Sequence, residues 1–277
     1  MTPATPADSA PSWSPDQYLR YEELRARPLR DLLAALPPVP GAPAPRIADL
    51  GCGPGNSTAL LARRWPAARI TGYDNSPEML ERARRSTGPQ QGGGRVGFAH
   101  ADLGDWRPPR DERFGLILAN AVLHWVPEHP AHLGSWLGPL APRGVLAFQV
   151  PGNFRAPSHT LLAELCAAPR WRDRLGGLVR PEPVLSPAGY TDLLEGCGCE
   201  VDAWETTYHQ LLPGPDPVLE WVRGTALRPV LDRLADDDEA RDAFLEEYRR
   251  ALATAYPPGP HGTRFPFRRV FVVARAR

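Results

Sequence analysis

Residues 47–58 read IADLGCGPGNST, a short apolar run that ends at an acid, Asp49, and continues into a glycine-rich turn. The glycines occupy alternate positions, at Gly51, Gly53 and Gly55. Polar residues from Asn56 onward can then open a helix, and we include Asn56 among the cofactor-binding residues. A strand, a glycine turn and a helix in this order let the backbone approach a ligand closely, so we expect this stretch to bind a nucleotide-like cofactor.

The spacing of this turn argues against a nicotinamide dinucleotide. The pattern G-x-G-x-G is one residue shorter than the G-x-G-x-x-G pattern of dinucleotide-binding enzymes. Pro54 also removes one backbone N–H from the loop, and such donors hold the pyrophosphate in that class. The turn therefore favours a cofactor without a phosphate over the cofactor of a nicotinamide dehydrogenase.

Two further acids follow later apolar runs. Asp74 lies in GYDNSPEML and Asp102 in HADLGDW, and we include their neighbours Asn75 and Leu103 in the same site. The carboxylate of Asp74 can accept hydrogen bonds from both ribose hydroxyls, and that of Asp102 can accept one from the amino group of adenine. Asp49 can orient the loop or bind an ammonium group. Three carboxylates around one loop would attract a positively charged cofactor. Aspartates at strand ends can instead cap the next helix, which is the alternative interpretation.

Apolar runs and helical segments alternate from residue 46 to residue 150. The expected strands are 46–50, 69–74, 96–100, 114–120 and 144–150, with helices at 57–65, 77–85 and 132–140. Strands that alternate with helices are typical of a parallel, doubly wound sheet, so the predicted fold class is α/β. After residue 151 the pattern becomes mainly helical, with further strands expected at 199–212 and 268–276.

One sheet with a helical insertion explains the chain better than two separate domains, so we expect a single domain over 14–277. The expected parts are a disordered tail (1–13), a lid helix (14–36), a cofactor-binding core (46–150) and a mainly helical substrate cap (151–198 and 213–258). Arg27-Pro28 should interrupt the lid helix, because proline lacks the N–H that an inner helical turn requires.

The charge balance excludes several classes of partner. The chain holds 32 Lys and Arg against 32 Asp and Glu, and all of these cations are arginines. Without a basic excess we expect no nucleic-acid or membrane partner, and no apolar run in the sequence is long enough to span a bilayer.

We expect a cytoplasmic protein with free thiols, because the first residues do not resemble a secretory signal. We expect no metal, since Cys197-Gly-Cys199 has no second ligand pair.

Four segments, DLGCGPGNST, GYDNSPEML, ADLGDW and NAVLHWVPEH, resemble the motifs of class I S-adenosylmethionine-dependent methyltransferases. The segments WSPDQYLRYEELRARP, GCEVDAWETTYHQLL, WVRGTALRPVL and FVVARAR more specifically resemble the trans-aconitate methyltransferases. The resemblance covers nearly the whole chain, from Trp13 to Arg277. It implies a Rossmann-like, seven-stranded, mostly parallel sheet whose last strand runs antiparallel. It also implies S-adenosylmethionine as cofactor and methyl transfer to a carboxylate of trans-aconitate, giving a monomethyl ester.

The resemblance also assigns residues of the site. The three glycines would face the methionine portion of the cofactor, Asp74 the ribose and Asp102 the adenine. Asn120 would lie beside the reactive sulfonium end, where His124 and Trp125 would help to position the reactants. His124 departs from the family pattern, in which a glutamine more often precedes the tryptophan, so the identity of the acceptor stays open.

A carboxylate acceptor is ionised at neutral pH, so the reaction needs no general base. A tricarboxylate does need cations, and arginine suits carboxylates through its paired N–H donors. The candidates to hold the carboxylates that do not react are Arg180, Arg228 and Arg269, with Arg223 behind them. Tyr208 can bond the substrate or pack in the sheet, and Tyr18 and Tyr21 can close over the site or staple their helix to the sheet.

Two other functions fit the same residues. A methyltransferase can act on another small acid or on a hydroxyl acceptor, and the segments 151–195 and 205–230 would decide which. A module that binds S-adenosylmethionine without catalysis is disfavoured, because the acids and glycines of the motifs are intact. The sequence leaves the oligomeric state open.

Overall fold

The computed structural model describes residues 22–88, 92–108, 111–126, 128–179 and 182–277. They divide into two compact units, which we describe separately. The sheet unit comprises Glu22–Asn153, Glu182–Tyr208 and Phe267–Arg277, and the helical unit comprises Phe154–Pro181 and His209–Pro266. The expected tail at 1–13 and the first part of the expected lid helix, 14–21, lie outside the described residues.

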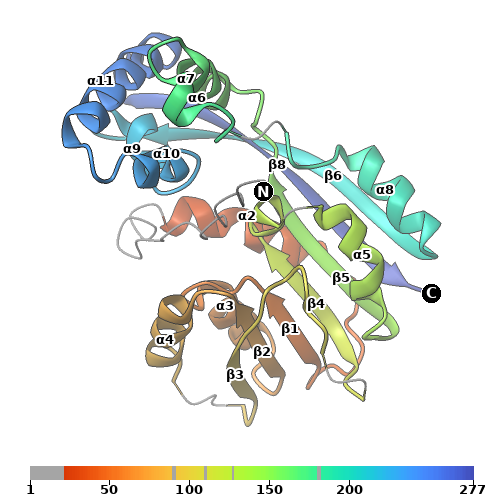
Figure 1. Ribbon diagram of the computed structural model, residues 1–277. Coiled ribbons are helices and arrows are strands. Elements are labelled where there is room, and N and C mark those ends of the chain that lie inside the picture. Colours follow the sequence, from red (N-terminus) through yellow and green to blue (C-terminus); the bar gives the residue numbers. More distant parts are fainter. Residues whose placement is uncertain (1–21, 89–91, 109–110, 127, 180–181) are drawn as a thin grey trace, which may run out of the picture. The chain divides into compact units, whose positions relative to one another are not determined.

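The sheet follows the order β3-β2-β1-β4-β5-β8-β6 (Figure 1). Its strands are β1 (Arg46–Leu50), β2 (Arg69–Asp74), β3 (Arg95–His100), β4 (Phe114–Asn120), β5 (Leu140–Pro151), β6 (Cys199–Leu212) and β8 (Gly262–Ala276). Strands β1 to β5 pair in parallel, whereas β8 runs antiparallel to β5. This arrangement confirms the predicted α/β sheet with an antiparallel last strand. A short strand, β7 (Pro258–Gly259), adds to β8.

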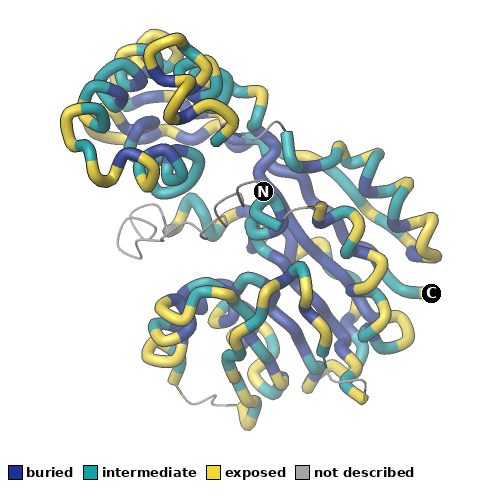
Figure 2. Tube along the Cα trace, viewed as in Figure 1, coloured by how far each residue is buried: buried dark blue, intermediate teal, exposed yellow. Residues whose placement is uncertain are grey.

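The core of the sheet unit lies around β1 and β4, whose residues are almost all buried (Figure 2). Leu116 and Leu118 share one apolar cluster with Leu61 of helix α3 (Asn56–Arg64) and with helix α2 (Glu22–Ala34). Parallel strands covered on both faces read as continuous apolar runs, which is why they could be found in the sequence.

Capping residues set where the helices begin. Helix α4 (Pro77–Ser86) follows Ser76, whose hydroxyl accepts from the N–H of Met79 at 3.3 Å. Helix α8 (Pro187–Gly196) begins in the same way after Ser186, and both helices carry proline in the first turn, where no N–H is needed. Helix α5 (His129–Leu137) and the 3-10 helix η1 (Leu123–Trp125) complete this unit.

The predicted break at Arg27-Pro28 is wrong, because α2 continues through Pro28. The proline removes one backbone hydrogen bond from the helix. Leu29, Leu32 and Leu33 are buried in the core cluster, and this burial outweighs the lost bond.

Three other elements begin three or more positions before their predicted starts. Strand β5 begins at Leu140, and the shift from the pair Phe114–Leu140 to the pair Leu116–Val145 absorbs the proline and glycine that suggested a later start. Strand β8 begins at Gly262, six positions before the predicted start, and α5 begins at His129. Each error lies at an element end, where local signals are weakest.

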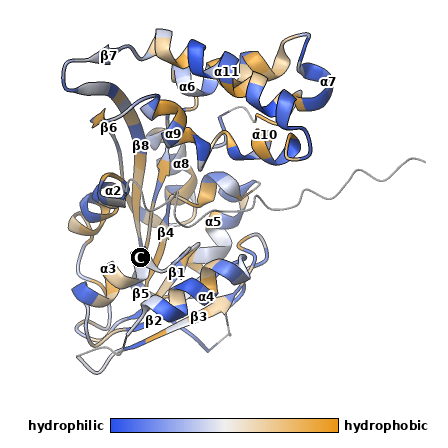
Figure 3. Cartoon of the chain, turned by 90° about the vertical axis from the view of Figure 1, so that its left-hand side faces the viewer, coloured by the Kyte–Doolittle hydropathy of each residue, from blue (hydrophilic) through white to orange (hydrophobic). Residues whose placement is uncertain are grey.

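The helical unit contains α6 (Pro157–Ala167), α7 (Arg172–Leu175), α9 (Pro217–Arg223), α10 (Arg228–Arg233) and α11 (Asp238–Ala255). Helix α11 carries both hydrophobic and hydrophilic residues along its length (Figure 3). On its apolar side the buried Tyr248 donates to the carbonyl of Ser158 on α6, and Phe244 packs edge-on against Trp171. These helices confirm the mainly helical pattern predicted after residue 151.

Candidate functional site

The predicted motif residues lie at the carboxyl ends of four neighbouring parallel strands. Asp49 and Asp74 lie on β1 and β2, Asp102 follows β3, and Asn120 ends β4. Parallel strands present their carboxyl ends at one edge of the sheet, so the fold brings these residues to the same edge. The strand order reverses between β1 and β4, which is where open α/β sheets bind ligands.

The glycine loop between β1 and α3 needs its glycines for different reasons. All three have positive φ, at 68° for Gly51, 54° for Gly53 and 90° for Gly55. A Cβ atom on Gly51 would lie 2.3 Å from Cγ2 of Val122, in the loop that follows β4. A Cβ atom on Gly53 would meet nothing in the described chain within 4 Å, so the backbone there faces space that a ligand can occupy.

Asp74 ties β2 to this loop. Its Oδ2 accepts from the backbone N–H of Gly53 at 2.8 Å, and its Oδ1 accepts from the N–H of Ser76 at 2.9 Å. A carboxylate has about four acceptor positions, so further donors such as two vicinal hydroxyls can still bind. The side chain of Ser76, not that of Asp74, caps the following helix, which disfavours a purely capping role for Asp74.

Asp49 is a fully buried acid beneath the loop. Its Oδ2 accepts from the hydroxyls of Ser57 at 2.7 Å and Thr58 at 2.6 Å, while its Oδ1 has no partner among the described residues. Burial raises the pKa of Asp49 to about 6, with a further contribution from the charge of Asp74 and opposition from the two hydroxyls. An unpartnered buried acceptor of this kind fits a cationic group.

The remaining predicted cofactor residues lie around these acids. Oδ1 of the exposed Asp102 accepts a backbone N–H two residues on at 2.8 Å, and Leu103 beside it is buried. Asn75 is exposed, with its carbonyl 3.1 Å from Nε2 of His100. Asn56 is the first residue of α3. These positions are compatible with an adenosine that lies along the ends of β2 and β3.

A chain of hydrogen bonds leads inward from Asn120. Its Oδ1 accepts from Nε2 of Gln149 on β5 at 2.6 Å, and Oε1 of Gln149 accepts from Nη1 of Arg269 on β8 at 3.1 Å. Gln149 and Arg269 are buried, and the guanidinium of Arg269 lies 4.6 Å from the ring centroid of Phe267. Gln149 was not predicted, although a lone polar residue in the apolar run VLAFQV was a signal.

His124 and Trp125 lie in η1, close after Asn120, with their ring centroids 4.9 Å apart. Both side chains are half-buried. Because Gly51 has no Cβ, Val122 can lie directly against it, so the loop that carries these rings meets the glycine loop. The structure thus brings two separately predicted motifs together.

Cys52 lies inside the glycine loop and is buried. Burial raises the pKa of its thiol well above the usual value, and the charges of Asp49 and Asp74 raise it further. Within the described residues, no three His, Cys, Asp or Glu side chains gather as metal ligands. No helix in that part of the chain has the length and apolar character needed to cross a membrane.

The predicted substrate residues have different surroundings. Tyr208 is buried in the core of the sheet unit, and its hydroxyl donates to Asp31 on α2 at 2.6 Å, which favours the packing interpretation. Arg228 belongs to the helical unit, where its Nε lies 2.9 Å from Oδ1 of Asp232. Three more candidates lie outside the described residues, namely Arg180, Tyr18 and Tyr21.

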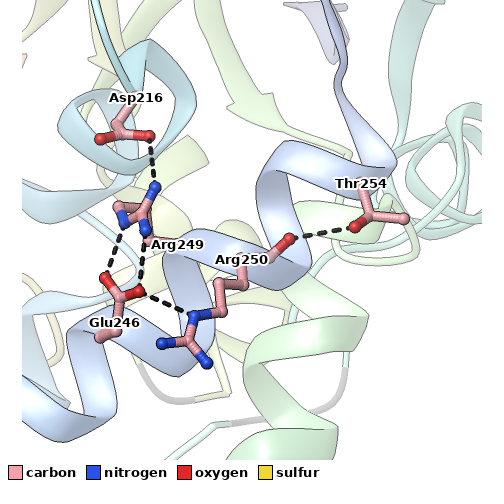
Figure 4. Close-up of polar contacts among 5 residues, drawn as sticks. All are labelled: Asp216, Glu246, Arg249, Arg250 and Thr254. Carbon is pink, nitrogen blue, oxygen red and sulfur yellow. Dashed lines mark hydrogen bonds and ion pairs between the residues drawn. The ribbon is translucent and has the colours of Figure 1, made fainter.

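Arginines of the helical unit also pair with acids of that unit. Glu246 accepts from Arg249 with both oxygens at 2.8 Å and from Arg250 at 2.7 Å, and Arg249 lies 3.7 Å from Asp216 (Figure 4). These bonds lower the pKa of Glu246 to about 2. Arg223 forms a similar pair with Glu220 at 3.3 Å. We therefore assign no substrate carboxylate to this network.

Comparisons with known proteins show which family and which fold this chain resembles. The family described as methyltransferase domain matches residues 47–144. The trans-aconitate 2-methyltransferase of Streptomyces coelicolor is 60% identical over 268 residues, covering 96% of this chain and 88% of the relative. That of Streptomyces avermitilis is 56% identical, covering 96% and 97%. The crystal structure of the YcgJ protein of Bacillus subtilis has a TM-score of 0.53 at 16% identity, covering 92% of this chain and 99% of that chain, and shows the same fold.

Proposed function

Because this chain belongs to the trans-aconitate 2-methyltransferase family, we propose that it transfers the methyl group of S-adenosylmethionine to a carboxylate of trans-aconitate, giving a monomethyl ester. The observation that carries the proposal is the identity of 60% over 96% of the chain. The polar sheet edge supports it, because its residues match the chemical groups of this cofactor.

Each part of S-adenosylmethionine has a counterpart at this edge. The unpartnered Oδ1 of Asp49 would accept from the ammonium, and the open backbone at Gly53 would lie along the methionine portion. Asp74 would accept from the ribose hydroxyls, and Asp102, with Asn75 and Leu103, would surround the adenine. When bound, the cofactor supplies an electrophilic methyl group on a positively charged sulfur.

For methyl transfer to a carboxylate, this chain must position the methyl donor and the acceptor carboxylate, and it does not need to move a proton. The acceptor is ionised at neutral pH, so no residue needs to act as a general base. The half-buried rings of His124 and Trp125 would exclude water, which strengthens the attraction between the two opposite charges. Asn120 would orient the reacting groups at the mouth of the site.

The other carboxylates of the substrate require positive charge. In the sheet unit, Arg269 lies behind Asn120 in the same hydrogen-bond chain and would supply a positive potential there. The roles of Arg180, Arg228, Tyr18 and Tyr21 stay predictions. A cytoplasmic location and the absence of nucleic-acid and membrane partners also stay predictions.

Transfer of radiolabelled methyl from S-adenosylmethionine to a panel of acceptors tests this proposal. The panel holds trans-aconitate, cis-aconitate, citrate and isocitrate, with simple hydroxylated aromatics for contrast. Much faster labelling of trans-aconitate than of the other acceptors would support it. If the protein binds the cofactor and labels only a hydroxyl compound, the acceptor is wrong and a general base must exist, with His124 as the first residue to examine.

A further inference from the structure

We propose that Gln149 is a positioning residue, which fixes Asn120 as a hydrogen-bond donor toward the reacting carboxylate of the acceptor. The inference rests on the proposed function, because it names the part of the same site that recognises the acid. It follows from the direction of the hydrogen bonds that join Asn120, Gln149 and Arg269.

Arg269 sets this direction. A guanidinium carries only donors, so the atom of Gln149 that it meets at 3.1 Å must be the oxygen Oε1. The NH2 group of Gln149 then faces Asn120 at 2.6 Å, and Asn120 must meet it with Oδ1. If the side-chain amide of Gln149 were turned around, its NH2 group would face the donors of Arg269. Gln149 is only 1% exposed, and buried polar groups without partners are costly.

The backbone beside Asn120 is held by the same residue. Ala121 has a left-handed φ of 55°, which is strained for a residue with a Cβ atom. Its N–H donates to the main-chain carbonyl of Gln149 at 2.9 Å. The side chain of Gln149 therefore holds the amide of Asn120, while its main-chain carbonyl, which any residue at 149 would supply, holds the residue that follows.

Because Oδ1 of Asn120 accepts from Gln149, its NH2 group is left to donate at the sheet edge, where Asn120 is partly exposed. A sulfonium cation would require an acceptor at this position, whereas a carboxylate requires a donor. A neutral donor can orient one carboxylate oxygen and leave the negative charge for attack by the other. A direct arginine contact would stabilise that charge more strongly and weaken the nucleophile. The charge of Arg269 stays two hydrogen bonds away.

Exchanging amides for carboxylates of the same shape reverses this polarity. In Gln149→Glu, residue 149 has only acceptors, so Asn120 must turn its NH2 group inward and present an oxygen to the edge. In Asn120→Asp, Gln149 keeps its orientation and an oxygen again faces the edge. Gln149→Met is the matched control, because it removes the tether without reversing the polarity.

We expect both carboxylate variants to raise KM for trans-aconitate roughly 10- to 100-fold, the range for losing a hydrogen bond to a charged group. Gln149→Met should raise it less, because Asn120 can still present its NH2 group part of the time. The affinity for S-adenosylmethionine, measured by titration calorimetry, should stay close to that of the wild type. Thermal unfolding of each variant checks that it is folded.

Three results would overturn the inference, and they differ from one another. If the wild type methylates trans-aconitate and both carboxylate variants keep its KM, the inference fails and the proposed function stands. If the two carboxylate variants bind S-adenosylmethionine more tightly than the wild type, the group that Asn120 presents at the edge faces the sulfonium of the cofactor and not the acceptor. If the wild type labels no acid, the proposed function has failed and the inference with it. Should Gln149→Glu not fold, Asn120→Asp decides the question alone.

Discussion

Asp74 and Gly53 join the second strand of the sheet to the cofactor loop through a hydrogen bond of 2.8 Å. In Asp74→Asn, one carboxylate oxygen becomes an NH2 group that must face a backbone donor, at Gly53 or at Ser76. We expect the dissociation constant of S-adenosylmethionine to rise roughly 10- to 100-fold by calorimetry, because loop and ribose contacts are both weakened. The exposed Asp105 supplies the control, and Asp105→Asn should leave the affinity unchanged. Equal affinities in the two variants would contradict the role of Asp74.

Alanine substitutions at Gly51 and Gly53 should have different effects on the stability of the fold and on cofactor binding. Gly51→Ala places a Cβ atom 2.3 Å from Val122 and should lower the free energy of unfolding by roughly 2–4 kcal/mol. Gly53→Ala meets no such contact, so it should lower that energy by only about 1–2 kcal/mol while it obstructs the cofactor. Urea unfolding and cofactor titration of both variants provide the comparison. Equal stability losses would show that backbone strain, and not the contact with Val122, dominates.

Asp49 makes stability depend on pH in the direction opposite to that of a salt-bridged acid. Its pKa of about 6 in the folded chain exceeds the ordinary value of 3.8, so between these values the folded state holds a proton that the unfolded state has released. The contribution of Asp49 to the free energy of unfolding should therefore fall as pH rises from about 4 to about 6, by on the order of 2–3 kcal/mol. Asp49→Asn should remove this dependence and be more stable at neutral pH, as unfolding curves across the interval would show. A variant less stable than the wild type at neutral pH would contradict this account.

The same carboxylate should couple cofactor affinity to pH. A nearby ammonium favours the charged form of Asp49, so the wild type should bind S-adenosylmethionine more tightly as pH rises through about 6. In Asp49→Asn, affinity should be lower and should not change with pH over this interval. Calorimetry of both proteins across the interval checks the expectation, and parallel pH dependences would assign the effect to another group.

Methyl transfer should not accelerate with pH near neutrality, because the acceptor is already ionised. His124→Gln removes the titratable group beside Trp125, and it should retain kcat within about tenfold, whereas losing a general base typically costs about 100-fold or more. Initial rates at saturating substrate, measured from neutral to mildly alkaline pH, give both quantities. A sigmoidal rise in kcat that disappears in this variant would show that His124 accepts a proton.

Local spacing explains what the sequence could predict. The strand, the glycine turn and Asp49 are neighbours along the chain, so the cofactor loop can be recognised from the sequence without knowledge of the fold. The role of Gln149 depends on the antiparallel register between β5 and β8, which brings it to Arg269 across 120 positions. No local pattern encodes that register.

Tertiary packing also overrode one strong local signal. Proline predicted a break in the N-terminal helix, but three buried leucines of α2 hold Pro28 inside a continuous helix. Tyr208 was ambiguous for a related reason, since its partner Asp31 lies 177 positions away. Features that depend on distant partners were therefore the ones that the sequence could not decide.

A thiol within a cofactor loop exposes an enzyme to oxidants and alkylating reagents when it ionises, because the thiolate is the reactive form. At Cys52, burial and the two neighbouring carboxylates keep the thiol protonated. Cys197 is the exposed cysteine among the four, so it is the one that reagents in solution can reach directly. We therefore expect burial, together with the acids that we propose to bind the cofactor, to protect this loop from oxidative damage.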